Sequence, residues 1–199
     1  MRNLIALLAL VFSSPVNPIT IPDKPNREFL DLYDRVLQLN YVKLYGYSDQ
    51  ELFVVSNIIE TVTRQHDVNQ YLMVAIFEVE SSFGTNKLLK TNGVPTDFGW
   101  GQIHRQHLKR LKLNSKLLLE NDAYSIEASV VFMASVQKSY GRETNFYSRY
   151  HSYTPKFRRI YEAKVRDALT ILGIKKLELG FQKIKSGTPL CNFETSDRN

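Results

Sequence analysis

Apolar residues recur at intervals of three and four positions along most of this chain, which predicts helices rather than strands. The spacing predicts helices over 27–44, 49–66, 68–84, 102–111, 123–140, 145–152 and 154–172, with a short apolar element at 117–119. Residues 85–101 contain Asn92, Gly93 and Pro95 and are predicted to form a loop with room for one short β-hairpin. The predicted fold class is therefore all-α, with one domain over 28–173.

Several helix boundaries follow from capping residues. Ser48, with Glu51 three positions later, has the order of a capping box at a helix N-terminus. Thr154 followed by Pro155 places a capping residue before a proline at the first helical position. Gly173 follows the last predicted helix, as is typical of a helix C-terminus.

The segment 68–84 is apolar on nearly every face and carries an acid near its end. Met73, Ile76 and Phe77 lie seven, four and three residues before Glu80 and share its helical face. Burial and the negative end of the helix dipole both favour the protonated acid, and Gly84 is the predicted helix stop. We therefore expect Glu80 to have a raised pKa and to act as a general acid. The alternative is a structural ion pair with an Arg or Lys.

A glycine-rich turn follows this helix, in the order Gly99-Trp100-Gly101-Gln102. Two glycines around a Trp suit a tight turn that a ligand can approach closely. Gln102 offers amide donors and an acceptor, and Trp100 offers a flat aromatic face. These groups suit an N-acetylated sugar, which has amides, hydroxyls and apolar ring faces.

The motifs together resemble the lytic transglycosylases, whose catalytic domain is similar to goose-type lysozyme. The resemblance covers roughly residues 48–170 and includes the turn above as its second motif. The other matching segments, in chain order, are Glu80-Ser81-Ser82-Phe83, then Ser125-Ile126-Glu127-Ala128 with Arg149-Tyr150-His151-Ser152, then Tyr161 with Val165. The sequence departs from the family in two places: Trp100-Gly101 replaces Leu-Met, and His151 replaces Asn. Neither departure involves Glu80.

The resemblance implies a lysozyme-like fold and a peptidoglycan lytic transglycosylase activity. In that family one Glu, here Glu80, protonates the glycosidic oxygen and then removes a proton from the C6 hydroxyl of the substrate. No metal and no cofactor are needed. The substrate-binding residues would be Ser81, Gln102, Tyr150, Trp100 and Gly101, with Tyr150 also matching the tyrosine that orients the acid.

Other polar residues have simpler interpretations. Glu78 lies about 200° around the helix from Glu80, so we expect an ion pair or solvent there. Asp97 is most simply a turn residue, although in a goose-type-like muramidase it would position water. His104 and His107 have metal-ligand spacing, but a solvated helix face is the commoner explanation.

The ends of the chain indicate the compartment. Residues 1–14 resemble a signal peptide, 15–27 a Pro-rich linker and 174–199 a C-terminal tail with a short helix and a disordered end. The apolar run of the signal is too short to span a membrane. The lone Cys191 excludes an internal disulfide. We expect a periplasmic or secreted protein.

The net charge of +6 favours an anionic partner. We expect peptidoglycan glycan strands, with a secretion or conjugation machine as a further partner because the chain is little more than a catalytic domain. No motif for nucleic-acid binding accompanies the charge. Two alternatives to the transglycosylase remain: the muramidase and a non-catalytic cell-wall-binding component.

Overall fold

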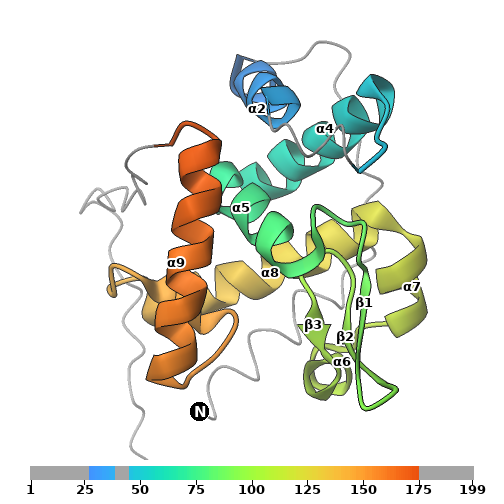
Figure 1. The fold of residues 1–199 in the computed structure, drawn as a ribbon, viewed down its shortest axis with the longest axis vertical. Coiled ribbons are helices and arrows are strands. Elements are labelled where there is room, and N and C mark those ends of the chain that lie inside the picture. The colour runs from blue at the N-terminus through green and yellow to red at the C-terminus, as the bar shows by residue number, and fades with distance from the viewer. Residues whose placement is uncertain (1–26, 39–44, 175–199) are drawn as a thin grey trace, which may run out of the picture.

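A computed structural model of the chain describes residues 27–38 and 45–174. This part is mostly helical with a small three-stranded sheet, which confirms the predicted class at that level (Figure 1). The elements are, in chain order, α2 (Arg27–Gln38), α4 (Asp49–Gln65), α5 (Gln70–Ser81), β1 (Leu88–Thr91), β2 (Val94–Phe98), β3 (Ile103–His104), α6 (Arg105–Leu111), α7 (Ser115–Glu120), α8 (Asp122–Tyr140), the 3-10 helix η1 (Phe146–Arg149) and α9 (Pro155–Ile171).

Helix α5 runs through the core, as its apolar sequence predicts. Its residues from Leu72 to Phe77 are all 0% exposed, and the helix contacts both α4 and α9 (Figure 1). Fully burying one large apolar side chain contributes about 1.5–3 kcal/mol. This stretch therefore fixes the position of α5, and the last turn of α5 carries Glu80 to the edge of the core.

The predicted capping box is confirmed at the start of α4. The Ser48 hydroxyl accepts a hydrogen bond from the backbone N–H of Glu51, and the Glu51 carboxylate accepts one from the backbone N–H of Ser48. The predicted stop at the end of α9 is also confirmed, since Gly173 adopts a left-handed conformation with φ of 74°.

The predicted stop of the Glu80 helix is wrong. Helix α5 ends at Ser81, and the chain turns left-handed already at Ser82 and Phe83, with φ of 49° and 52°, before reaching Gly84. The reason is local: the Ser81 hydroxyl donates to the Phe77 carbonyl and accepts from the Gly84 N–H. These two hydrogen bonds end the helix at Ser81, three residues before Gly84.

The expected hairpin is present in the 85–101 loop. Strands β1 and β2 pair antiparallel, and the turn between them places both Asn92 and Gly93 at positive φ. A third strand, β3, pairs with β2 where a helix start at residue 102 was predicted. That prediction is wrong because Gln102 is left-handed, with φ of 47°, so α6 begins only after the His104 cap.

Several predictions fall outside the described residues: the signal peptide, the linker up to residue 26, the end of the first helix beyond Gln38, and the tail with Cys191. Among the helices that are described, none is both long and apolar enough to cross a membrane.

Candidate functional site

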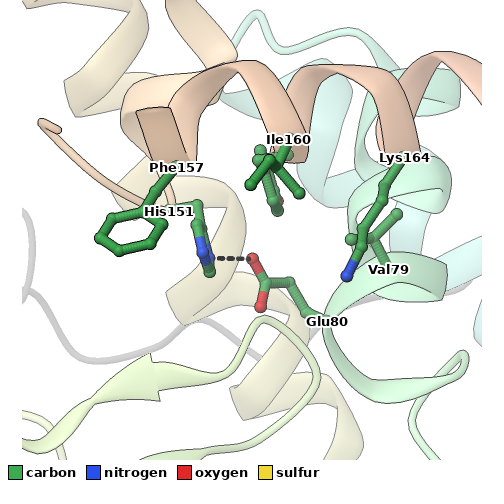
Figure 2. A pocket seen from close by; sticks show the side chains of 7 residues that line it. Val79, Glu80, His151, Phe157, Ile160 and Lys164 are labelled. Atoms are coloured by element: carbon green, nitrogen blue, oxygen red, sulfur yellow. Dashed lines mark ion pairs between the residues drawn. The ribbon is translucent and has the colours of Figure 1, made fainter. Parts of the chain in front are cut away.

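A pocket opens at the junction of α5 and α9, and Glu80 lies in it (Figure 2). Helix α5 supplies Val79 and Glu80, and the segment between η1 and α9 supplies His151. The remaining lining comes from one face of α9: Phe157, Ile160, Tyr161 and Lys164. The Glu80 side chain is 11% exposed, so a ligand can reach it although most of it is covered.

His151 forms an ion pair with Glu80 when its ring is protonated. Its Nδ1 lies 3.6 Å from Glu80 Oε1, and its ring stacks on Tyr161 with the ring centroids 4.7 Å apart and the planes 2° from parallel. The interaction with the Glu80 carboxylate raises the pKa of His151. This effect is larger than the lowering of the pKa that burial causes. Sequence reasoning left this residue out of the site. The signal that could have found it was its position directly after Tyr150 in a matching motif.

Tyr161 forms the floor beneath His151. Its side chain is 3% exposed, and its buried hydroxyl has no hydrogen-bond partner among the described residues. Burial, followed by the negative charge of Glu80, raises the pKa of Tyr161 well above its usual value. The phenol therefore stays protonated and can donate a hydrogen bond if Glu80 or a ligand moves closer.

Ser81 does not reach the pocket. It is 1% exposed and its hydroxyl is used by the two bonds that end α5. The expectation that Ser81 binds substrate is therefore corrected: its position in the last turn of the helix directs it into the core.

Trp100 also belongs to the core rather than to a ligand groove. Its side chain is 0% exposed, with the Phe83 ring 5.1 Å away and the Phe77 ring 5.5 Å away. Its indole N–H donates to Asp122 Oδ1 at 2.9 Å, which satisfies its only polar group. The expected flat face for a sugar is thus covered by protein, because the turn directs the indole beneath Gly84.

Gly101 and Tyr150 contact each other. The Tyr150 hydroxyl donates to the Gly101 carbonyl at 3.0 Å, and a Cβ on residue 101 would lie 2.1 Å from the same hydroxyl. Burial above all, then the charge of Glu80, raises the pKa of Tyr150. The close approach that requires glycine here is to a tyrosine and to Ser129 of α8, so the predicted substrate contact is replaced by a contact within the protein.

Gln102 stabilises the turn from its left-handed position. Its amide nitrogen donates to the carbonyls of Asn86 and Gly99, both at 2.9 Å. Only its amide oxygen is left for a ligand, and Gln102 does not line the pocket around Glu80.

The other acids near Glu80 differ from expectation. Glu78 is neither ion-paired nor solvent-facing within the described part of the chain: one oxygen accepts from the Tyr45 hydroxyl at 3.1 Å, and the other is buried without a partner. Burial raises the pKa of Glu78.

Asp97 lies in β2, paired with Leu89 and His104, instead of in a turn. It does not line the pocket.

His104 and His107, the two histidines with metal-ligand spacing, have structural roles in α6. His104 Nδ1 accepts from the Gln106 N–H as the helix cap, and His107 Nδ1 lies 2.9 Å from Arg110. Burial, followed by the charge of Arg110, lowers the pKa of His107 to about 4. His107 is half-buried against Phe132, so the expected solvated face is only partly correct. Residues 27–38 and 45–174 contain no group of three or more potential metal ligands.

Comparisons with known protein families, with curated proteins and with solved structures find no match to this chain. The chemistry of the site must therefore be argued from its own residues. The pocket combines one carboxylate, one imidazole, one ammonium group, one phenol and three apolar side chains, an arrangement that can exchange a proton with a bound ligand.

Proposed function

We propose that this chain is a peptidoglycan lytic transglycosylase with a lysozyme-like fold. It would cleave the β-1,4 bond between N-acetylmuramic acid and N-acetylglucosamine, with Glu80 as the single acid and base. The observation that carries the proposal is spatial: the four sequence motifs that suggested this activity lie far apart in the chain, yet each contacts another of the four in the fold.

Three contacts bring the motifs together. Phe83 of the first motif packs on Trp100 of the second. The Trp100 backbone N–H donates to Ser125 of the third at 2.8 Å. From the same third motif, His151 links Glu80 to Tyr161 of the fourth. The motifs thus belong to one packed unit, which supports the proposal that they form a single catalytic domain.

The reaction needs one group that first gives and then takes a proton. Glu80 protonates the bridging oxygen as the bond from C1 of the muramic acid to that oxygen breaks. The carboxylate then removes the proton of the C6 hydroxyl, and O6 bonds to C1 to close a 1,6-anhydro ring. His151, 3.6 Å from Glu80, is placed to stabilise the carboxylate formed between the two steps.

Hydrolysis by the same acid is the competing reaction, with water in place of the C6 hydroxyl. It needs a second carboxylate as base, about 6.5–9.5 Å from the acid, with room for water between them. The acid expected for that role, Asp97, does not line the pocket. The charge of Asp97 does raise the pKa of His151, but Glu80 is the one carboxylate among the lining residues, which favours the reaction that requires only Glu80.

The test is digestion of purified peptidoglycan by the full chain, with mass spectrometry of the soluble products. Glu80→Gln keeps the shape of the side chain and removes its proton, and should lower the rate by roughly 10²–10⁴-fold. Glu78→Gln is the matched control, because Glu78 lies on the same helix but outside the pocket, and should keep wild-type activity.

Anhydro-muropeptides from the wild type and Glu78→Gln, but not from Glu80→Gln, support the proposal. Products with free reducing ends would instead indicate the muramidase. Absence of any product, together with retention on peptidoglycan, would indicate the non-catalytic cell-wall-binding component. The proposal also includes location at the cell envelope, with peptidoglycan strands as partner and local wall opening for a secretion or conjugation machine.

A further inference from the structure

One cation of the pocket has no role in the chemistry described above. Lys164 projects from α9 on one side of Glu80, and His151 lies on the other (Figure 2). Lys164 is exposed and forms no ion pair within residues 27–38 and 45–174, unlike Arg158 and Arg166 on the same helix. The charge of Lys164 is therefore available to a ligand.

The apolar residues around Lys164 restrict what that ligand can be. Phe157 and Ile160 precede it by seven and four residues, so the three side chains share one face of α9. Phe157 is 52% exposed and Ile160 is 51% exposed, although both border a pocket that contains an acid. A ligand that covers this face needs apolar groups for Phe157 and Ile160 and an anionic group for Lys164.

We propose that Lys164 is a specificity-determining residue that binds a carboxylate on an acidic peptide attached to the sugar strand beside the cleaved bond. This inference rests on the proposed function, because it places the peptide in the pocket of Glu80. The stem peptides of peptidoglycan have the required chemistry: methyl groups of alanine together with free carboxylates. A neutral sugar polymer could cover the exposed apolar face but would leave Lys164 without a partner of opposite charge.

The charges around Lys164 are consistent with an anion site. His151 is the other cation of the pocket when protonated, and the charge of Lys164 opposes that protonation, which lowers the pKa of His151 against the larger effect of Glu80. A carboxylate bound by Lys164 would reduce this repulsion. The anion would therefore bind in the same pocket as the catalytic acid, on the Lys164 side of Glu80 (Figure 2).

The test compares two soluble glycan substrates that differ only in charge: strands with intact stem peptides, and the same strands after carbodiimide coupling of the stem carboxylates to a neutral amide. Lys164→Gln in the full chain should raise KM about threefold on the acidic strands, as expected for an exposed ion pair, and should leave kcat unchanged. It should have no effect on the amidated strands. Lys156→Gln, on the same helix but outside the pocket, is the matched control.

The outcomes separate this inference from the proposed function. If Glu80-dependent turnover occurs but Lys164→Gln changes KM equally on both substrates, or on neither, the role of Lys164 is refuted while the activity stands. Binding of the acidic strands to Glu80→Gln chains, with and without Lys164→Gln, gives a second measurement that needs no turnover. Equal binding by the two would refute the inference even if the protein proves to be a wall-binding component.

Discussion

The contact between Glu80 and His151 leads to a quantitative prediction about stability and pH. At the observed 3.6 Å, two unit charges attract by about 1 kcal/mol in water and by roughly 4–5 kcal/mol at an effective dielectric constant of 20. The His151 side chain is 47% exposed, so solvent screening places the interaction near the lower figure. We expect the pair to stabilise the folded protein by about 1 kcal/mol when His151 is protonated and Glu80 is in its carboxylate form, as it is between the two proton transfers.

The sign of the pH dependence follows from the raised pKa of His151. A group with a higher pKa in the folded state binds its proton more tightly there, so folding is favoured while the proton is bound. The stabilisation should be complete below the ordinary histidine pKa of about 6.5 and lost as the pH rises through the higher folded value. The contribution is thus present at pH 5.5 and absent at pH 8.5.

The assay is urea unfolding of the wild type, His151→Asn, Glu80→Gln and the double variant at both pH values. The double-mutant cycle isolates the pair from other effects of each substitution. We expect a coupling free energy of about 1 kcal/mol at pH 5.5 and none at pH 8.5. A coupling of equal size at the two pH values, or a larger one at pH 8.5, would refute the charge pairing. An NMR titration should also show the pKa of His151 falling in Glu80→Gln.

The core around the turn gives three further predictions, each measured by urea unfolding. Trp100→Ala should lower the free energy of unfolding by about 3–5 kcal/mol, because it empties a fully buried site; a loss under 1 kcal/mol would contradict that burial. Gly101→Ala should cost about 1–3 kcal/mol, because the new methyl group meets Tyr150 and Ser129, and unchanged stability would show that the turn can move away. Ser48→Ala should cost about 1 kcal/mol through the lost cap, whereas Ser139→Ala, which removes no helix cap, should cost less.

Much of the fold could be predicted because it depends on local rules. Helical spacing located α4, α8 and α9, and the capping residues at Ser48 and Thr154 placed two helix starts correctly. The Asn92-Gly93 pair indicated the hairpin, since both residues tolerate the positive φ that its turn requires. The end of α5 was missed because a buried serine closed the helix, and serine is not a residue that usually ends one.

The candidate site was less predictable because its contacts are long-range. His151 and Glu80 lie on different elements, and no spacing in the sequence relates them. Trp100 between two glycines has the same local pattern whether its ring faces a ligand or the core. Only the packing of Phe77 and Phe83 decides between these, and it places the ring inside.

The glycines of the turn show why the site lies on the α9 side of Glu80 and not on the sheet side. A glycine lets another group approach the backbone closely, but that group can be a side chain of the same protein and need not be a ligand. Gly101 admits the Tyr150 hydroxyl, and Gly99 would place a Cβ 2.2 Å from the Ser125 hydroxyl. Both glycines thus pack the turn against buried side chains that lie on α8 or directly after η1. The pocket that contains Glu80 is bordered by α9 instead, and His151, Tyr161 and Lys164 line it beside the acid.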